Sequence, residues 1–427
     1  MRSFYKKIIV ALLFFEAKVA LWMHRPRIVG VTGSVGKTST KDAIASVARQ
    51  LGSTRASAKS YNSELGLPLT ILGLETAWGS VFGWARNLIR GLFSAIFSFS
   101  YPKLLVLELG VDHPGDMDRA IRLLSLDTAV ITHIGEVPVH VEFFESARGV
   151  LQEKAKIIRG LSEDSVLILT YDDERVRELK NECKCRVITF GRQEGADVHG
   201  DYYNVMYDEA GRPTGVTFKV LHGGNVVPIV LSGVLGKQTM YPSLAAAAFG
   251  ITHDLNLVEV GDALSQRVFP PGRMRVLEGL HGTTIIDDTY NASPIAVREA
   301  LTTLKDLSVK GKKIAVLGDM AELGELSEQA HEDVGSQCAG LDVLVTVGNR
   351  MRGARDAAKR TGVGRIESFE NARDAGLFVK SILKEGDIVL FKGSQSMRVE
   401  RAVGEILAHP EKKHELLVRQ GGEWGRR

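Results

Sequence analysis

Short runs of aliphatic and β-branched residues alternate with helical patterns along most of the chain from Arg27 onward. This alternation is typical of a mostly parallel sheet with helices on both faces. The first series predicts strands at 28–32, 104–109, 128–134 and 166–170. A second series predicts strands at 283–287, 313–318, 343–347 and 387–392. We therefore predict an α/β protein with two sheets, the second of them Rossmann-like.

The pattern changes between the two series. Residues 216–234 form two strand-like runs around Gly-Gly, which predicts an antiparallel hairpin at one edge of the first sheet. An alanine-rich helix is expected at 243–250. Because Pro270-Pro271-Gly272 separates the series, the predicted organisation has three parts: an apolar, basic helix in 1–26, a central domain in 27–271 and a carboxyl-terminal domain in 272–427. The charged tail after His409 is expected to be frayed.

Two apolar segments, 1–24 and 81–100, also carry basic residues. The run from Ile8 to Phe15 is interrupted by Glu16 and is short for a membrane span, which needs about 20 apolar residues. Residues 81–100 repeat apolar side chains at helical spacing opposite arginines. Two interpretations stay open: both segments are helices that pack on the core, or both make peripheral contact with a membrane.

Composition narrows the class of partner. The chain has 427 residues, 44% of them hydrophobic, and a net charge of +3, so it has the balance of a globular protein without the strong positive field of a nucleic-acid binder. Its three cysteines are too few for a disulfide framework and lack the spacing of a zinc site. We expect reduced thiols in a cytoplasmic protein, with membrane association left open.

The strongest chemical signal follows the first predicted strand, where Thr-Gly-Ser-Val-Gly-Lys-Thr-Ser precedes a helix. Small residues let backbone N–H groups surround a phosphate, the lysine reaches the terminal phosphates, and the following threonine can bind Mg²⁺. The expected nucleotide-binding residues are Gly33, Ser34, Val35, Gly36, Lys37, Thr38 and Ser39. The loop departs from the strict Walker pattern because Val31 replaces a glycine. A simple helix-capping turn would not explain Gly-Lys-Thr.

Five further blocks follow in order along the chain. They are Tyr-Asn-Ser-Glu-Leu-Gly-Leu-Pro-Leu-Thr at 61–70, Glu-Leu-Gly-Val-Asp-His-Pro-Gly-Asp at 108–116, Asp-Asp-Thr-Tyr-Asn-Ala-Ser-Pro at 287–294, Leu-Gly-Asp-Met-Ala-Glu-Leu-Gly at 317–324 and Lys-Gly-Ser-Gln-Ser-Met at 392–397. With the loop, they resemble the Mur ligases, ATP-dependent amide-bond-forming enzymes of peptidoglycan synthesis. The blocks at 287–294 and 317–324 resemble the members that use D-alanyl-D-alanine.

The resemblance implies roles for individual residues. Glu108, which ends an apolar strand, is expected to bind Mg²⁺ together with Thr38, and His140 is expected to bind a second Mg²⁺. Lys154 aligns with a lysine that related ligases carbamylate, although Lys156 stands nearby and makes the alignment ambiguous. The residues expected around the adenosine are Arg273 and Asn291, with Asp287 and Asp319 as polar supports.

The expected reaction is therefore ATP-dependent and needs Mg²⁺, with a UDP-sugar peptide and D-alanyl-D-alanine as substrates and Lys37, His140 and Lys154 as catalytic residues. Two alternatives stay open: another Mur-type amino-acid ligase, such as a folate polyglutamate or poly-amino-acid synthetase, and a non-catalytic ATP-binding scaffold at a membrane.

Three departures from the family pattern qualify this expectation. The resemblance implies a uridine-nucleotide domain before the loop, where this sequence has about thirty residues, so we expect that domain to be missing or replaced. Thr239 and Pro242 replace asparagines expected near the adenine, and Gln395 replaces an arginine.

Overall fold

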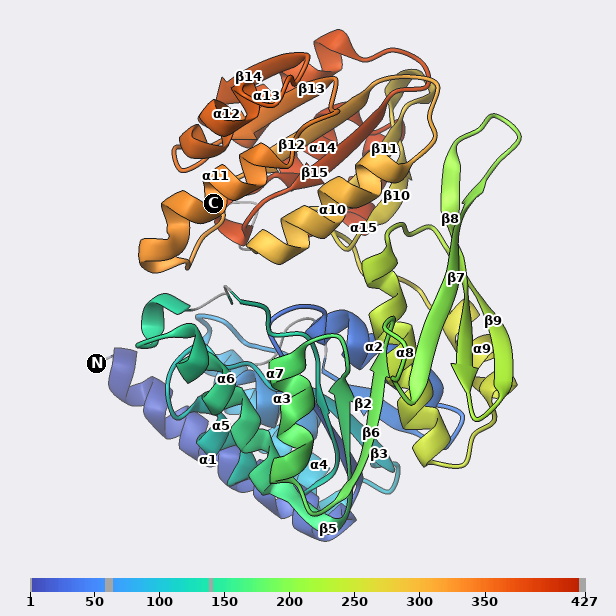
Figure 1. The fold of residues 1–427 in the computed structure, drawn as a ribbon. Helices are drawn as coiled ribbons and strands as arrows, with labels where there is room; N and C mark the ends of the chain where they lie inside the picture. Colours follow the sequence, from blue (N-terminus) through green and yellow to red (C-terminus); the bar gives the residue numbers. More distant parts are fainter. Residues whose placement is uncertain (1, 58–63, 137, 139–140, 422–427) are drawn as a thin grey trace.

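In a computed structural model, which describes residues 2–57, 64–136, 138 and 141–421, the chain forms two α/β units (Figure 1). The lower unit in Figure 1 contains a nine-stranded sheet, and the upper unit contains a six-stranded sheet. The predicted α/β class is confirmed.

The large sheet is parallel over most of its width and has the strand order β2-β3-β1-β4-β5-β6-β7-β8-β9. Its strands are β1 Arg27–Thr32, β2 Thr54–Ala56, β3 Leu104–Glu108, β4 Leu126–Ile131, β5 Leu161–Thr170, β6 Arg186–Gly191, β7 Val198–Tyr207, β8 Pro213–His222 and β9 Asn225–Ser232. The pairs β7–β8 and β8–β9 are antiparallel, so the hairpin predicted at a sheet edge is confirmed. Buried β1 lies between β3 and β4, and the carboxyl ends of these three strands meet at one edge.

Helices cover both faces of the large sheet. The helices α2 Lys37–Ala48, α8 Met240–Thr252 and α9 Leu257–Ser265 pack on one face. In α8, the run from Ala245 to Ala248 is fully buried, and such small side chains let the helix approach the sheet closely. The opposite face carries α1 Arg2–His24, α3 Gly66–Leu72, α4 Val81–Phe97 and α5 Asp116–Ile121, and α6 Ala147–Ala155 and α7 Glu174–Arg177 complete the unit.

The small sheet has the order β10-β11-β15-β12-β13-β14, and all its pairs except β10–β11 are parallel. Its strands are β10 Arg275–Glu278, β11 Thr284–Asp288, β12 Lys313–Gly318, β13 Val343–Val347, β14 Arg365–Phe369 and β15 Ile388–Lys392. The helices are α10 Pro294–Asp306, α11 Ser327–Ser336, α12 Arg352–Lys359, α13 Ala372–Ile382, α14 Glu400–Ile406 and α15 Lys413–Leu416.

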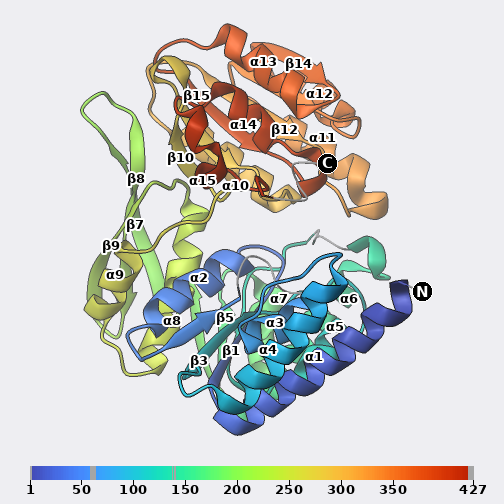
Figure 2. The ribbon, with the colours of Figure 1, turned by 180° about the vertical axis from the view of Figure 1, so that it is seen from behind.

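The two basic, apolar segments form α1 and α4, which lie side by side on the outside of the large-sheet unit (Figure 2). Gly91 and Ala95 of α4 are buried against its neighbours, and these small residues leave the larger apolar side chains outside. Ile89 is 73% exposed and Phe93 is 65% exposed. Both helices pack on the core, α1 through Leu13, Ala17 and Ala20 and α4 through Ala95, as the core-packing interpretation expects, but most of the apolar stripe of α4 stays exposed. Among the described residues, we find no helix with an apolar stretch long enough to cross a membrane.

Two local expectations are wrong. Cys183 and Cys185 form a disulfide, because the chain turn after a short 3-10 helix brings their Cα atoms to 5.3 Å, whereas Cys338 is a buried thiol as expected. The chain after His409 is not frayed as far as residue 421, because Leu417 is buried and Arg419 forms an ion pair with Glu400.

Candidate functional site

The predicted phosphate-binding loop connects β1 to α2 at the carboxyl edge of the large sheet. Gly33 has a φ of 140° and Gly36 a φ of 82°, a conformation that favours glycine. A Cβ atom on Gly33 would lie 2.0 Å from Thr132 Oγ1, so this position also has no room for a side chain. Gly36 caps α2, whose first N–H groups have no acceptor within the helix.

Two amides of this loop already have partners. The N–H groups of Ser34 and Val35 both donate to the carbonyl oxygen of His133 at 3.0 Å. The buried Oγ of Ser34, in contrast, has no hydrogen-bond partner within the described part of the chain. A phosphate at this loop would therefore meet the first N–H groups of α2 and the Ser34 hydroxyl, while the amides of Ser34 and Val35 hold the loop against His133.

Charged groups converge at the start of α2. Desolvation lowers the pKa of Lys37, Arg273 lowers it further, and the carboxylates of Glu108 and Asp112 oppose this effect. Arg273 Nη2 donates to Thr38 Oγ1 at 3.1 Å, although the two residues are far apart in sequence. The structure thus brings together four of the predicted site residues, namely Lys37, Thr38, Glu108 and Arg273.

Glu108 and Thr38 fit a magnesium ion. Glu108 is 2% exposed, and its Oε2 atom has no hydrogen-bond partner among the described residues. A buried carboxylate oxygen without a partner is costly unless a cation or donor occupies the space in front of it. No described cluster of three or more His, Cys, Asp or Glu could hold a metal alone, so nucleotide oxygens and water would complete the coordination. His140, the other predicted ligand, lies outside the described residues.

Lys154 lies in the interior, and Lys156, close to it in sequence, is partly exposed. Lys154 is fully buried, and its Nζ has no hydrogen-bond partner among the described side chains. Desolvation, assisted by the positive charge of Lys37, lowers the pKa of Lys154 to about 7. The carboxylates of Asp112, Asp116 and Glu153 oppose this lowering of the pKa. A neutral amine close to a phosphate site can act as a nucleophile, which Lys156, with its raised pKa, cannot easily do.

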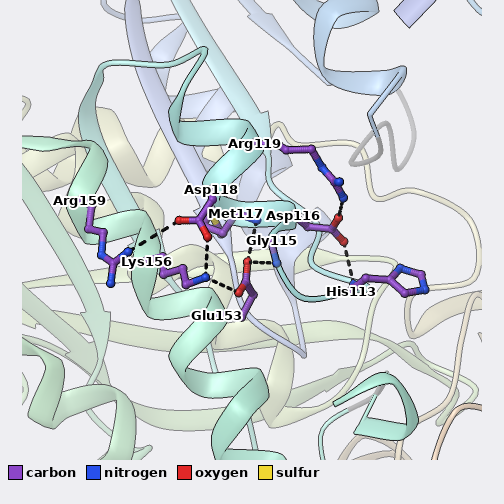
Figure 3. A network of polar contacts seen from close by, with 9 residues as sticks. All are labelled: His113, Gly115, Asp116, Met117, Asp118, Arg119, Glu153, Lys156 and Arg159. Carbon is purple, nitrogen blue, oxygen red and sulfur yellow. Dashed lines mark hydrogen bonds and ion pairs between the residues drawn. The ribbon is translucent and has the colours of Figure 1, made fainter. Parts of the chain in front are cut away.

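The surface network explains why Lys156 is held away from the site (Figure 3). Lys156 Nζ donates to Asp118 Oδ2 at 2.6 Å and to Glu153 Oε2 at 2.7 Å. The other oxygen of Glu153 accepts the backbone N–H groups of Gly115 and Met117, both at 3.0 Å. Glu153 therefore fixes the start of α5. Because Asp116 follows Gly115 directly, it also fixes one of the carboxylates that act on Lys154.

In the small-sheet unit, the block at 287–294 is anchored by its two aspartates. Fully buried Asp287 accepts the N–H of Gly272 at 2.9 Å and the hydroxyl of Thr289 at 2.6 Å, and burial raises its pKa to about 6. Lys392 Nζ donates to Asp288 at 2.5 Å and to the carbonyl oxygen of Asn291 at 3.0 Å. The backbone of Asn291 is thereby fixed at the carboxyl edge of the small sheet.

Tyr290 packs against two arginines. The Arg273 guanidinium lies 3.9 Å from the ring centre and that of Arg419 lies 5.7 Å from it. Arg419 also donates to the carbonyl oxygen of Thr289 at 3.1 Å and pairs with buried Glu400 at 3.0 Å. This arrangement orients Arg273 toward Thr38.

Asp319 is not brought to the loop by any contact that we observe. Its Oδ1 accepts the N–H of Met351 at 2.9 Å, and its carbonyl oxygen accepts the N–H of Ser394 at 3.1 Å. Asp319 therefore joins the end of β12 to two neighbouring loops of the small-sheet unit.

Sequence reasoning missed Glu153, Asp288, Lys392 and Arg419 as positioning residues. Asp288 and Lys392 lie inside the sequence blocks at 287–294 and 392–397, so these blocks could have indicated their role. Arg419 had no such signal, because its partner Glu400 follows the last block and both contacts depend on tertiary folding.

Comparison with known proteins identifies the family. The Mur ligase middle-domain model matches residues 31–83 and 89–250, and the Mur ligase glutamate-ligase-domain model matches residues 272–395. UDP-N-acetylmuramoyl-tripeptide–D-alanyl-D-alanine ligase of Bacillus subtilis is 31% identical over 92% of this chain and 79% of its own length. The Escherichia coli ligase of the same name is 27% identical over 90% and 78%.

Solved structures agree with these matches. MurF from Acinetobacter baumannii superposes with a TM-score of 0.76 at 25% identity and covers 93% of this chain and 80% of its own. The MurF ligase of Thermotoga maritima in complex with ADP gives a TM-score of 0.75 at 26% identity, with coverages of 95% and 84%. The chain therefore belongs to the Mur ligases, the family of ATP-dependent amide-bond-forming ligases.

Proposed function

We propose that this enzyme joins D-alanyl-D-alanine to the peptide of a UDP-N-acetylmuramoyl tripeptide, using ATP and Mg²⁺. The observation that carries the proposal is the convergence of Lys37, Thr38, Glu108 and Arg273 at the start of α2, on a chain related throughout to ligases of that name. In the reaction, a peptide carboxylate oxygen takes the γ-phosphoryl group and releases ADP. The amine of D-alanyl-D-alanine then attacks the acyl carbon, and phosphate leaves.

The side chains of the loop bind and orient the phosphates. Lys37 neutralises charge on the transferring phosphoryl group, and the first N–H groups of α2 hold the neighbouring phosphate oxygens. Thr38 and Glu108 would hold Mg²⁺, which supplies a Lewis acid against the phosphate oxygens. Arg273, which the family resemblance placed beside the adenosine, donates to the Thr38 hydroxyl at the phosphate-binding loop, and we propose that it binds a phosphate oxygen there.

Lys154 is proposed as the lysine that reacts with carbon dioxide. Its buried, unpartnered amine supports this role over Lys156, whose Nζ makes two ion pairs. The product would be an anion beside Lys37, which would relieve the repulsion between two amines and help orient the metal ligands. Asn291 and Asp287 are proposed to position the nucleoside end, and Asp319 to support the same loops from within the small-sheet unit. We also propose domain boundaries at 26/27 and 271/272.

Phosphate release tests the proposed reaction directly. The purified chain is mixed with Mg-ATP and a UDP-N-acetylmuramoyl tripeptide, and phosphate is measured with and without D-alanyl-D-alanine. We expect release only when all three substrates are present. Release with glutamate in place of D-alanyl-D-alanine would support the alternative of another amino-acid ligase, and ATP binding without release under any condition would support the scaffold.

We also propose a cytoplasmic location with peripheral membrane contact through residues 1–24 and 81–100. The need for cellular ATP supports the location. The apolar side chains that α1 and α4 leave exposed support the contact.

A further inference from the structure

Large apolar side chains are exposed along several helical turns of both α1 and α4. His24 Nε2 lies 3.0 Å from the carbonyl oxygen of Ala95, which fixes the two helices side by side. Phe15 and Trp22 of α1 are 63% and 69% exposed, and Phe82 of α4 is 90% exposed. Clusters of exposed aromatic side chains on neighbouring helices mark an interaction surface rather than ordinary solvent-facing positions.

The exposed charges on this surface have one sign. The side chains of Lys7, Lys18, Arg86 and Arg90 are exposed, whereas Glu16, the acidic residue of the two helices, is 7% exposed and faces α4. Basic side chains around an apolar helical face match an anionic bilayer, where the apolar groups enter the acyl boundary and the cations meet phosphate groups. To pair with these cations, a protein partner would need acidic side chains around an apolar patch, whereas a bilayer needs only anionic lipid.

A cavity of about 340 Å³ opens at the border of this surface, between α1 and α5. It is lined by Phe14, Phe15, Lys18, Arg119, Arg122 and Leu123. Arg119 pairs with Asp116 and Glu64, so its charge is partly neutralised. Lys18 and Arg122 make no ion pair with any described residue, so two unpaired cations and two aromatic residues line one cavity.

We infer that the α1–α4 surface docks on a bilayer and that the cavity takes the phosphate of one anionic phospholipid headgroup. The aromatic rings of Phe14 and Phe15 would contact the glycerol and upper acyl region, and Lys18 and Arg122 would bind the phosphate. This inference rests on the proposed membrane contact and is independent of which peptide the ligase accepts.

Vesicle flotation with the full chain tests the inference. We compare neutral phosphatidylcholine vesicles with vesicles that also contain phosphatidylglycerol, at fixed ionic strength. The double variant Lys18→Gln/Arg122→Gln should bind the anionic vesicles roughly 30-fold more weakly than the parent, since each basic side chain near the headgroups contributes about a factor of five. Lys310→Gln/Lys380→Gln, on the small-sheet unit, removes the same charge and should bind as the parent does.

The possible failures separate the two proposals. If the parent floats with neither type of vesicle, membrane contact itself is wrong, whatever the ligase assay gives. If both double variants bind anionic vesicles equally well, the headgroup cavity is wrong but the contact survives. A further outcome is that inorganic phosphate releases the parent protein from anionic vesicles when chloride at equal ionic strength does not. That result would assign the cavity to free phosphate instead of lipid. Equal melting temperatures of the variants exclude unfolding as the cause.

Discussion

Lys37 and Lys154 place two amines in one desolvated site. The free energy that this burial costs the fold indicates a functional role for the site. An ammonium group without a partner in the interior is destabilising, and desolvation together with the positive charge of Lys37 lowers the pKa of Lys154. Glu108 adds a buried carboxylate oxygen without a partner. Buried charged groups without partners destabilise the fold. Where they occur together, a binding site or a reactive group is therefore expected.

Replacing Lys154 with methionine should abolish activity and stabilise the fold. Between the folded pKa of about 7 and the ordinary value of 10.5, the unfolded chain binds more protons at this residue than the folded chain. Stability of the parent therefore rises with pH through that window. In bicarbonate-free buffer, the melting temperature of Lys154→Met should exceed that of the parent most at pH 7 and below, and the excess should vanish toward pH 10.5.

Lys156→Met is the matched control for this prediction. It removes a lysine from the same segment but breaks the ion pairs with partly exposed Asp118 and buried Glu153. It should keep activity within about tenfold of the parent. Retained activity in Lys154→Met together with loss in Lys156→Met would move the reactive lysine two residues along the chain.

Lys37→Ala should abolish turnover and leave the fold intact. The lysine supplies the cation closest to the start of α2, and loss of a single group that stabilises charge in a transition state costs about 10²–10³ in turnover. Phosphate release and circular dichroism measure the two effects. Arg49→Ala removes an exposed cation after the far end of the same helix and should be neutral. Near-parental turnover of folded Lys37→Ala would refute the nucleotide assignment.

At the scale of elements, α1 and α4 are held together by a contact that includes a buried acid. Burial raises the pKa of Glu16 to about 7, and its Oε2 has no hydrogen-bond partner in the described chain. A Cβ atom on Gly91 would lie 2.2 Å from this oxygen, so glycine at this position makes room for the carboxyl group. The packing of the two helices is therefore most stable when Glu16 is neutral.

Glu16→Gln should make stability less dependent on pH. The folded pKa lies above the ordinary value of 4.5, so the parent is most stable below pH 4.5 and loses stability as pH rises through 7. The variant should melt at a higher temperature than the parent at pH 8 and at a similar one at pH 4. Exposed Glu182→Gln serves as a control with no difference at either pH. If Glu16→Gln raised the melting temperature equally at pH 4 and pH 8, burial of the Glu16 carboxylate would not be the cause.

The sequence predicted regular elements far better than irregular ones. Strands β12 and β13 match their predicted bounds, because continuous apolar runs between turn residues specify buried parallel strands. Strand β2 has three residues and β14 is only half-buried, so neither has such a run, and both were missed. The phosphate loop was predictable from its glycines. The orienting pairs Lys392–Asp288 and Arg419–Glu400 were not, since they depend on tertiary contacts between distant segments.

At the scale of the whole molecule, Arg273 connects the two α/β units. It lies two residues before β10 of the small sheet, and it donates to Thr38 at the start of α2 on the large-sheet unit. Tyr290 and Arg419 pack beside it from the small-sheet unit. A nucleotide phosphate placed at α2 would attract the same guanidinium, so nucleotide binding and the approach of the two units are expected to be coupled.

Arg273→Ala should weaken this coupling. The hydrogen bond of a charged donor to a phosphate contributes about 1.5–3 kcal/mol, so KM for ATP should rise roughly 10- to 100-fold. Adding Mg-ATP should reduce the radius of gyration of the parent, measured by small-angle X-ray scattering, but change that of the variant less. Arg275→Ala is the matched control, because Arg275 donates to the carbonyl oxygen of Leu416 within its own unit. If the two variants have the same KM and the same scattering response, Arg273 does not couple the units, and the contact with Thr38 has only a structural role.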